Sequence, residues 1–342
     1  MQAELKTFIE GMPKAELHVH LEGCLTPQLA AKLAARNNMP LPEAVSKAST
    51  AEAFAFHDLT SFLAVYYPAM NVLQTATDFH DLAMDYLIKA HKHNIKHCEL
   101  FFDPQAHTSR GIPFPIVVMG YRSALLQAQR AFGISSALIM CFLRDMSAEF
   151  AMATLMDALP YKDSIIGVGL DSDERDNPPS KFAAVFQRAS KEGFLLTMHC
   201  DVDQKDSIEH IRQAIEEIQV DRIDHGTNIV EDLRLVEMIK TKAIGLTCCP
   251  ISNSIVTQDF KGKEILELLR NDVKVTLNSD DPAYFKGYAN ENVLKVAAET
   301  DITKKELVQL QRNAFNISWI SAWRRNHFLQ LLDTYASQHD CV

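Results

Sequence analysis

Short apolar runs recur along the whole chain, and a segment with the apolar spacing of a helix follows each of them. Runs that are apolar at nearly every position are typical of parallel strands covered on both faces. They lie at residues 14–23, 96–103, 134–144, 164–171, 193–199, 222–226, 243–249 and 273–280. Eight strand–helix units in 342 residues favour an α/β fold, a (β/α)8 TIM barrel. An open, doubly wound sheet is the alternative, but no Gly-x-Gly-x-x-Gly turn supports it.

Extra helices are expected between the first and the second strand. Thr26 and Pro27 form a typical helix start, and apolar residues then repeat at helical spacing. Similar patterns cover residues 59–66 and 76–93. The aromatic-rich segment 54–67 either packs into the core or lies over the mouth of a pocket as a lid. Because no linker or low-complexity stretch interrupts the alternation, residues 1–342 are expected to form one domain.

Composition narrows the class of protein. The chain is 47% hydrophobic and its net charge is −10, with acidic and basic residues mixed, so neither nucleic acid nor a membrane surface is an expected partner. No apolar run is long enough to span a bilayer, and the first residues carry no secretion signal pattern. The seven cysteines lack framework spacing, which indicates free thiols in a reducing cytoplasm. Assembly into a homo-oligomer stays open.

Polar residues collect where the predicted strands end, and these ends meet on one face of a barrel. His18 and His20 alternate with apolar residues, so they point to the same side of the first strand. A His-x-His pair alone is often two surface imidazoles, but His199 and Asp280 end two later strands. Three imidazoles and a carboxylate suit one zinc ion per chain.

His225 also ends a strand and is left over beside this ligand set. A neutral imidazole there can orient the water of a catalytic zinc site and take its proton. The alternative is a core histidine that binds a backbone carbonyl group. Asp224 and Gly226 on either side favour the catalytic role.

Several motifs resemble the adenosine/adenine deaminase branch of the amidohydrolase superfamily over roughly residues 10 to 330. They read more like adenine deaminases than adenosine deaminases and occupy residues 13–23, 102–111, 178–182, 249–253 and 279–285. The resemblance implies a zinc-dependent aminohydrolase that uses metal-bound hydroxide to remove an amino or substituted amino group from an adenine-like base. It implies that Asp281 bonds the purine N7 and that Gly169 gives a backbone donor to the ring. Glu22 stands where adenosine-selective relatives have an Asp that meets the ribose, which favours a free base.

One position departs from the resemblance. The fifth strand of the family ends in His-Ala-Gly-Glu, and the Glu protonates the ring nitrogen beside the attacked carbon. Here the run begins at His199, and Val202 occupies the Glu position. Valine cannot carry a proton, so Asp201 or Asp203 takes over the role, or the substrate needs no such proton, or deamination is impaired. A hydrolase of the same scaffold that acts on another heteroaromatic ring and a purine-binding paralogue are the alternatives.

Overall fold

The computed structural model describes residues 2–48, 54–200 and 206–341. Each of the eight predicted strands is present, and the fifth is divided into β5 and β6. The strands are β1 (Lys14–His20), β2 (Ile95–Phe102), β3 (Ser135–Leu143), β4 (Ile165–Asp171), β5 (Leu195–Leu196), β6 (His199–Cys200), β7 (Arg222–His225), β8 (Gly245–Cys248) and β9 (Val275–Leu277).

All strand pairs are parallel, and the sheet closes on itself. One run has the order β1-β2-β3-β4-β5 and the other β6-β7-β8-β9. Thr197, between β5 and β6, donates its N–H to Val168 of β4 at 3.0 Å, which joins the two runs. At the other seam Val19 pairs with Asp280 in parallel register. The closed barrel is therefore confirmed, and the open sheet is wrong.

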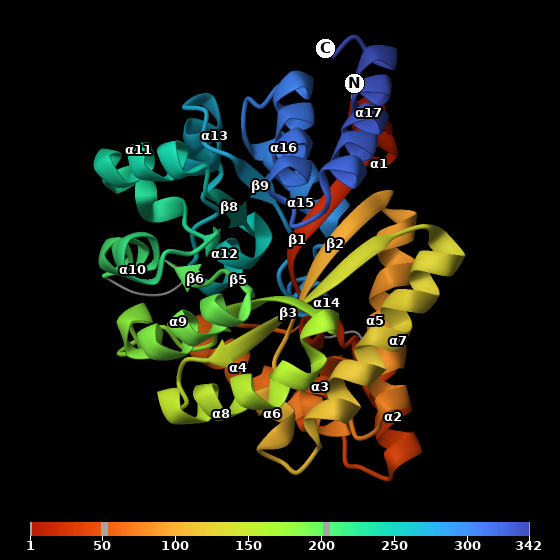
Figure 1. The fold of residues 1–342 in the computed structure, drawn as a ribbon. Coiled ribbons are helices and arrows are strands. Elements are labelled where there is room, and N and C mark those ends of the chain that lie inside the picture. Colours follow the sequence, from red (N-terminus) through yellow and green to blue (C-terminus); the bar gives the residue numbers. More distant parts are fainter. Residues whose placement is uncertain (1, 49–53, 201–205, 342) are drawn as a thin grey trace.

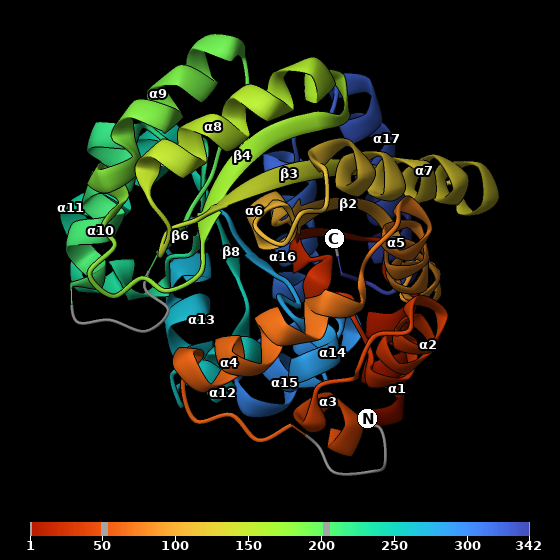
Figure 2. The ribbon, with the colours of Figure 1, turned by 90° about the horizontal axis from the view of Figure 1, so that it is seen from below.

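Helices wrap the barrel, as the view along its length shows (Figure 2). They are α1 (Gln2–Gly11), α2 (Pro27–Asn37), α3 (Glu43–Ala48), α4 (Leu59–Ala69), α5 (Ala76–Lys92), α6 (Pro104–Thr108), α7 (Phe114–Phe132), α8 (Ala148–Ala158), α9 (Ala183–Glu192), α10 (Ser207–Gln213), α11 (Leu233–Lys242), α12 (Pro250–Val256), α13 (Gly262–Arg270), α14 (Pro282–Phe285), α15 (Ala289–Glu299), α16 (Lys304–Ile317) and α17 (Ala322–Gln338). None of the described helices has the length and apolar character needed to cross a lipid bilayer.

Three of the extra helices after β1, namely α2, α4 and α5, form where the sequence places them, because each has a local start signal. The Thr26 hydroxyl caps α2 by accepting the N–H of Leu29 at 3.2 Å. Asp58 and Ser61 cap α4 reciprocally, and Thr75 and Asp78 do the same for α5. In Figure 1, α1 and α17 lie at the upper end of the barrel, where β1 begins, and α4 lies at the opposite end.

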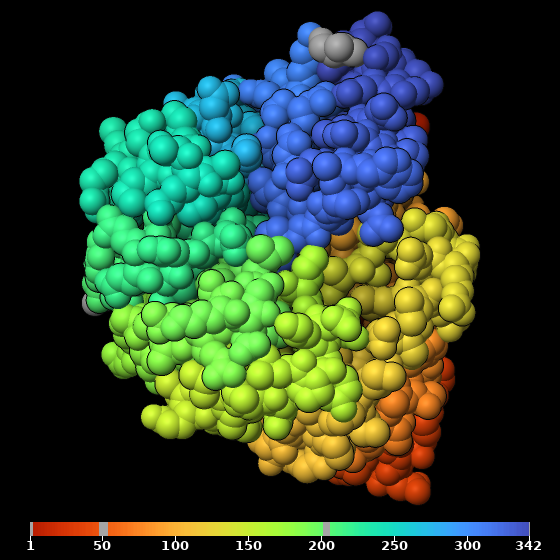
Figure 3. Space-filling view, viewed as in Figure 1, coloured from red at the N-terminus to blue at the C-terminus, as the bar shows by residue number. Residues whose placement is uncertain are grey.

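The interior of the barrel is packed beneath its carboxyl-terminal face. Phe101, Ile139 and Cys141 form a fully buried cluster between the strands. The ring of Phe101 contacts both His18 and His20, with centroids 5.0 Å apart in each case. On the side shown in Figure 3, side chains from the middle and the end of the chain cover the strands. His18 and His20 thus pack against an apolar layer in the barrel interior, and this contact fixes their position along the barrel axis.

Candidate active site

Four side chains meet at the carboxyl ends of β1, β6 and β9. Asp280 Oδ1 lies 3.3 Å from His18 Nε2 and 3.4 Å from His20 Nε2. His199 Nε2 lies 3.1 Å from His20 Nε2. One ligand atom from each of these four buried residues lies within 4.8 Å of the others. The structure therefore brings together the whole ligand set that the sequence predicts.

A carboxylate, Asp224, lies behind two of the histidines, and the Thr247 hydroxyl between them lies 2.9 Å from His18 Nδ1. Asp224 accepts hydrogen bonds from the hydroxyl groups of Thr197 and Thr247, at 2.7 and 2.9 Å. Its two oxygens lie 4.0 Å from His18 Nδ1 and 3.7 Å from His199 Nδ1. Because the Nδ1 atoms face this carboxylate, the Nε2 atoms point into the site, and this is a common arrangement behind metal-binding histidines.

Two of the site residues adopt left-handed backbone conformations. The φ angle is 62° at Asp280 and 61° at His225. Such angles are uncommon for residues with a Cβ atom and are maintained by the surrounding structure. Asp280 is held from both sides, because its N–H donates to His18 O at 3.1 Å and its carbonyl accepts the N–H of His20 at 2.9 Å.

The protonation of the site fits a cation. Burial lowers the pKa of His20 to about 4 and that of His225 to about 3. Burial and the neighbouring imidazoles also lower the pKa of His199 well below its usual range. Their nitrogens are therefore uncharged at neutral pH, and His18 Nε2 is buried with no hydrogen-bond partner among the described residues. Imidazole nitrogens and one carboxylate match the ligands that zinc prefers.

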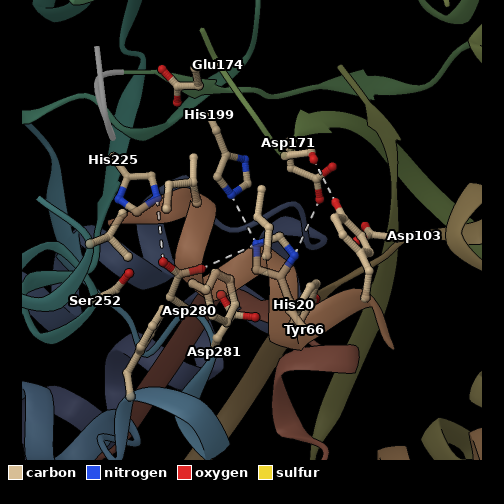
Figure 4. Close-up of a pocket in the computed structure, with 17 residues that line it drawn as sticks. His20, Tyr66, Asp103, Asp171, Glu174, His199, His225, Ser252, Asp280 and Asp281 are labelled. Carbon is tan, nitrogen blue, oxygen red and sulfur yellow. Dashed lines mark hydrogen bonds and ion pairs between the residues drawn. The ribbon is translucent and has the colours of Figure 1, made fainter. Parts of the chain in front are cut away.

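A cavity of about 470 Å³, its open mouth included, lies above these ligands. Its polar side carries carboxyl groups and the histidines His20, His199 and His225 (Figure 4). Its apolar side consists mainly of α4 side chains with Val256 and Phe285. Such a site suits a small, flat, partly apolar ligand.

The α4 helix decides the question left open for the aromatic segment 54–67. Leu59, Phe62, Leu63, Tyr66 and Tyr67 line the cavity. The Tyr67 hydroxyl donates to Ser172 Oγ at 2.7 Å and ties the helix to the end of β4. The segment therefore packs into the core on one side and covers the pocket on the other.

Three carboxyl groups of the pocket resist ionisation. Burial raises the pKa of Asp171 to about 7. Burial and the nearby carboxylate of Asp171 raise the pKa of Asp103 well above its usual range. Burial and the adjacent Asp280 do the same for the pKa of Asp281. Protonated carboxyl groups can both donate and accept hydrogen bonds, which suits the nitrogens of a heterocycle.

The predicted site residues fall into three groups. His225 and Asp281 line the cavity, and His225 Nε2 lies 3.7 Å from Asp280 Oδ2. Glu22 is buried beside the cavity without lining it, and its Oε1 accepts hydrogen bonds from His107 at 2.9 Å and Tyr121 at 2.8 Å. Asp201, Val202 and Asp203 lie outside the described residues.

Gly169 also lies away from the cavity, in the interior of β4. A Cβ atom there would come within 2.6 Å of Cys141 Sγ, so the absence of a side chain serves packing between strands. Ser172, three residues later, lines the cavity and has a φ angle of 74°. Ser172 is therefore the residue after β4 that borders the cavity.

Sequence reasoning also missed pocket residues to which it gave no role. Asp103 and Asp171 are the last residues of the predicted strands at 96–103 and 164–171, but nothing local in the sequence showed that both face His20. Their ligand atoms and that of His20 lie within 4.8 Å of one another. Ser252 lies in the motif at 249–253 but was given no role, and Glu174 carries no sequence signal of its own, because only the fold brings it to the cavity.

The barrel and this ligand set define a class of protein, a hydrolase with a candidate metal site at the carboxyl ends of its strands. Residues 13–335 match the family model described as adenosine deaminase. An uncharacterized deaminase of Schizosaccharomyces pombe is 49% identical over 98% of this chain and 99% of its own length. An adenine deaminase of Chlorobium phaeobacteroides is 43% identical over 97% of this chain and 98% of its own.

Solved structures agree with these matches. Adenine deaminase from Arthrobacter aurescens superposes with a TM-score of 0.90 at 37% identity and covers 96% of this chain and 100% of its own. An amidohydrolase from Burkholderia ambifaria with bound Zn gives 0.86 at 25% identity, covering 98% and 96%. The chain belongs to the adenosine deaminase family, and it is a hydrolytic deaminase.

Proposed function

We propose that residues 1–342 form one zinc-dependent aminohydrolase domain that removes the amino or substituted amino group from an adenine-like free purine base. The observation that carries the proposal is the meeting of the four ligand atoms of His18, His20, His199 and Asp280 below a small pocket. Relatives that are 42–49% identical and are called adenine deaminases or a deaminase support the choice of substrate.

Each role follows from a position in the pocket. Zinc held by the four ligands would supply a water molecule activated at neutral pH. The imidazole of His225 faces Asp280 Oδ2 at 3.7 Å, where it can accept a proton from that water and pass it to the departing amine. Asp281 hydrogen-bonds a nitrogen of the purine ring. The backbone donor to the ring that the resemblance assigns to Gly169 comes from this end of β4, where Ser172 lines the cavity.

Glu22 and α4 support a free base over a nucleoside. The Glu22 carboxylate is committed to His107 and Tyr121, and its second oxygen, although buried, does not reach the cavity. Beside its carboxyl groups, the pocket presents the apolar side chains of α4, which suit the face of a base more than a ribose. Glu22 thus acts on the substrate only through the shape of the pocket.

The position of Val202 favours a second candidate function. If no neighbouring group delivers the ring proton, the protein binds adenine-like purines but deaminates them poorly, or it acts on a heteroaromatic ring with another leaving group.

Cytoplasmic location and assembly as a homo-oligomer remain proposals from the sequence. None of the seven described cysteines forms a disulfide, which supports a reducing compartment.

A substrate panel tests the proposal. Zinc-loaded protein is assayed with adenine, N6-substituted adenines, adenosine and cytosine, and both the released amine and the product base are measured. We expect the highest kcat/KM with a free adenine-like base and tighter calorimetric binding of adenine than of adenosine. A preference for adenosine would overturn the free-base proposal, and turnover of cytosine alone would overturn the purine proposal.

A further inference from the structure

A second set of ligand-type atoms lies beside the first and shares two residues with it. His18, His225, Cys249 and Asp280 each place one nitrogen, sulfur or oxygen atom within 4.8 Å of the others, and all four are buried. Cys249 precedes α12 and follows β8 directly. The proposed reaction uses His225 and Asp280, but it gives no task to the thiol group.

The two oxygens of Asp280 face different neighbours. Oδ1 lies 3.3 Å from His18 Nε2 and 3.4 Å from His20 Nε2, whereas Oδ2 lies 3.7 Å from His225 Nε2. Figure 4 shows Asp280 between His20 and His225. One carboxylate can bridge two cations by binding one through each oxygen. An ion on Oδ1 therefore leaves Oδ2 free for a second ion on the side of His225.

The sulfur atom selects the kind of cation. Cys249 Sγ has a long contact of 3.7 Å with the carbonyl of Thr247, a weak interaction that a metal bond easily replaces. Thiolate and imidazole together favour thiophilic ions such as Zn²⁺ and Cd²⁺ over Mg²⁺ or Ca²⁺. His225 and Asp280 line the cavity, so an ion that enters the pocket reaches their ligand atoms first.

We propose that His225 Nε2, Cys249 Sγ and Asp280 Oδ2 form a second, inhibitory site for a thiophilic divalent cation, with Cd²⁺ or excess Zn²⁺ as the ligand. On binding, the thiol proton leaves to solvent and the sulfur bonds to the ion. The inhibitory effect rests on the proposed function, because the ion occupies the His225 nitrogen that handles the proton. Binding itself does not depend on it.

Titration with Cd²⁺ tests the site. Protein that already holds one zinc per chain receives Cd²⁺ while the ultraviolet charge-transfer band of the thiolate–cadmium bond is followed, and both metals are counted after desalting. We expect one zinc and one cadmium per chain and at least a tenfold loss of activity. Cys249→Ser should abolish the band and weaken Cd²⁺ binding at least tenfold. Cys98→Ser, a matched control that alters another fully buried thiol in the apolar core, should keep both.

The outcomes distinguish a failure of the proposed second metal site from a failure of the proposed deaminase function. A band that persists in Cys249→Ser, or cadmium that replaces zinc so that one metal remains, would overturn the second site. Cd²⁺ binding without inhibition would overturn the inhibitory role. A protein that deaminates no purine but still forms the band would contradict the proposed function alone. Cys249→Ala serves as a second variant if the serine variant fails to fold or to hold zinc.

Discussion

The carboxylate of Glu16 accepts hydrogen bonds from both the backbone N–H and the hydroxyl group of Ser279, with the N–H at 3.1 Å. Its other oxygen accepts the Tyr86 hydroxyl at 2.5 Å. Ser279 directly precedes Asp280, whose left-handed backbone needs support. The start of β1 therefore holds the segment that carries one proposed metal ligand and the pocket carboxyl group of Asp281.

Removing this support should weaken metal binding. We expect Glu16→Ala to lower zinc affinity by about 10–100-fold, the usual cost of losing a group that positions a metal ligand. Competition with a chelator measures it. Tyr86→Phe removes a partner of the same carboxylate without touching Ser279, so its zinc affinity should stay near that of the unaltered protein. Equal zinc affinity in Glu16→Ala, with only the metal-free stability lowered, would contradict the positioning role.

The metal site itself gives a direct prediction. His199→Ala should lose most of its zinc, because one of four ligands is absent and a buried cation needs its full set. Elemental analysis of the purified protein measures this. His91→Ala, which removes an exposed histidine far from the site, is the matched control. If both variants carry the same amount of zinc, His199 is not a ligand.

Glu99 and Arg222 form a buried ion pair in the barrel, and its contribution to the free energy of unfolding depends on pH. Burial alone would raise the pKa of Glu99, but the charge of Arg222 and the hydrogen bond with His97 outweigh it and lower that pKa to about 2. The contribution is therefore fully present above the unfolded-state pKa of about 4.3. It is lost as the pH falls from there towards 2.

We expect Glu99→Gln to reduce the free energy of unfolding at pH 7 by about 3–5 kcal/mol, because Arg222 stays buried and the carboxylate that remains near it, Asp224, lies 3.8 Å away. The difference from the unaltered protein should shrink below pH 4. Urea unfolding of metal-free protein from pH 7 to 3.5 measures both effects. Glu209→Gln breaks an exposed pair with Arg212 and should cost about 1 kcal/mol at most. A pH-independent difference for Glu99→Gln would refute the assignment.

The pattern of apolar residues identified the strands, because barrel strands are buried on both faces and therefore appear in the local sequence as continuous apolar runs. It could not divide the fifth strand. There the backbone changes partners, with Thr197 donating to Val168 in β4 while Met198 accepts from Asp224 in β7 at 2.9 Å. Such a change depends on neighbours that lie far away in the sequence.

The site was predictable where chemistry depends on residue type and strand position, as for His18, His20, His199 and Asp280. The site was less predictable where a role depends on which residue at the end of a strand reaches the cavity. Gly169 and Ser172 are three residues apart, and only the observed end of β4 shows that Ser172 reaches the cavity. Glu22 looks like a pocket residue in the sequence, but His107 and Tyr121, distant in sequence, hold its carboxylate beside the cavity.

The source of the ring proton can be tested although residues 201–205 lie outside the described structure. The resemblance to the family places Val202 where a glutamate delivers that proton. If no other group has replaced it, adenine turnover should be poor and Val202→Glu should raise kcat/KM on the order of 10²-fold, the contribution of a general acid. Steady-state kinetics with zinc-loaded protein measure this, and Val202→Gln, which cannot transfer the proton, is the control.

A different result is expected if Asp201 or Asp203 has taken over the role. The unaltered protein should then turn over a base-like substrate, and either Asp201→Asn or Asp203→Asn should lower kcat by 10²-fold or more with zinc content unchanged. The pH profile separates this from a structural effect, because loss of a proton donor removes one limb of the profile. If none of the three substitutions changes kcat or kcat/KM, the proton comes from outside this strand end, and the buried carboxyl groups of Asp103 and Asp171 become the groups to alter next.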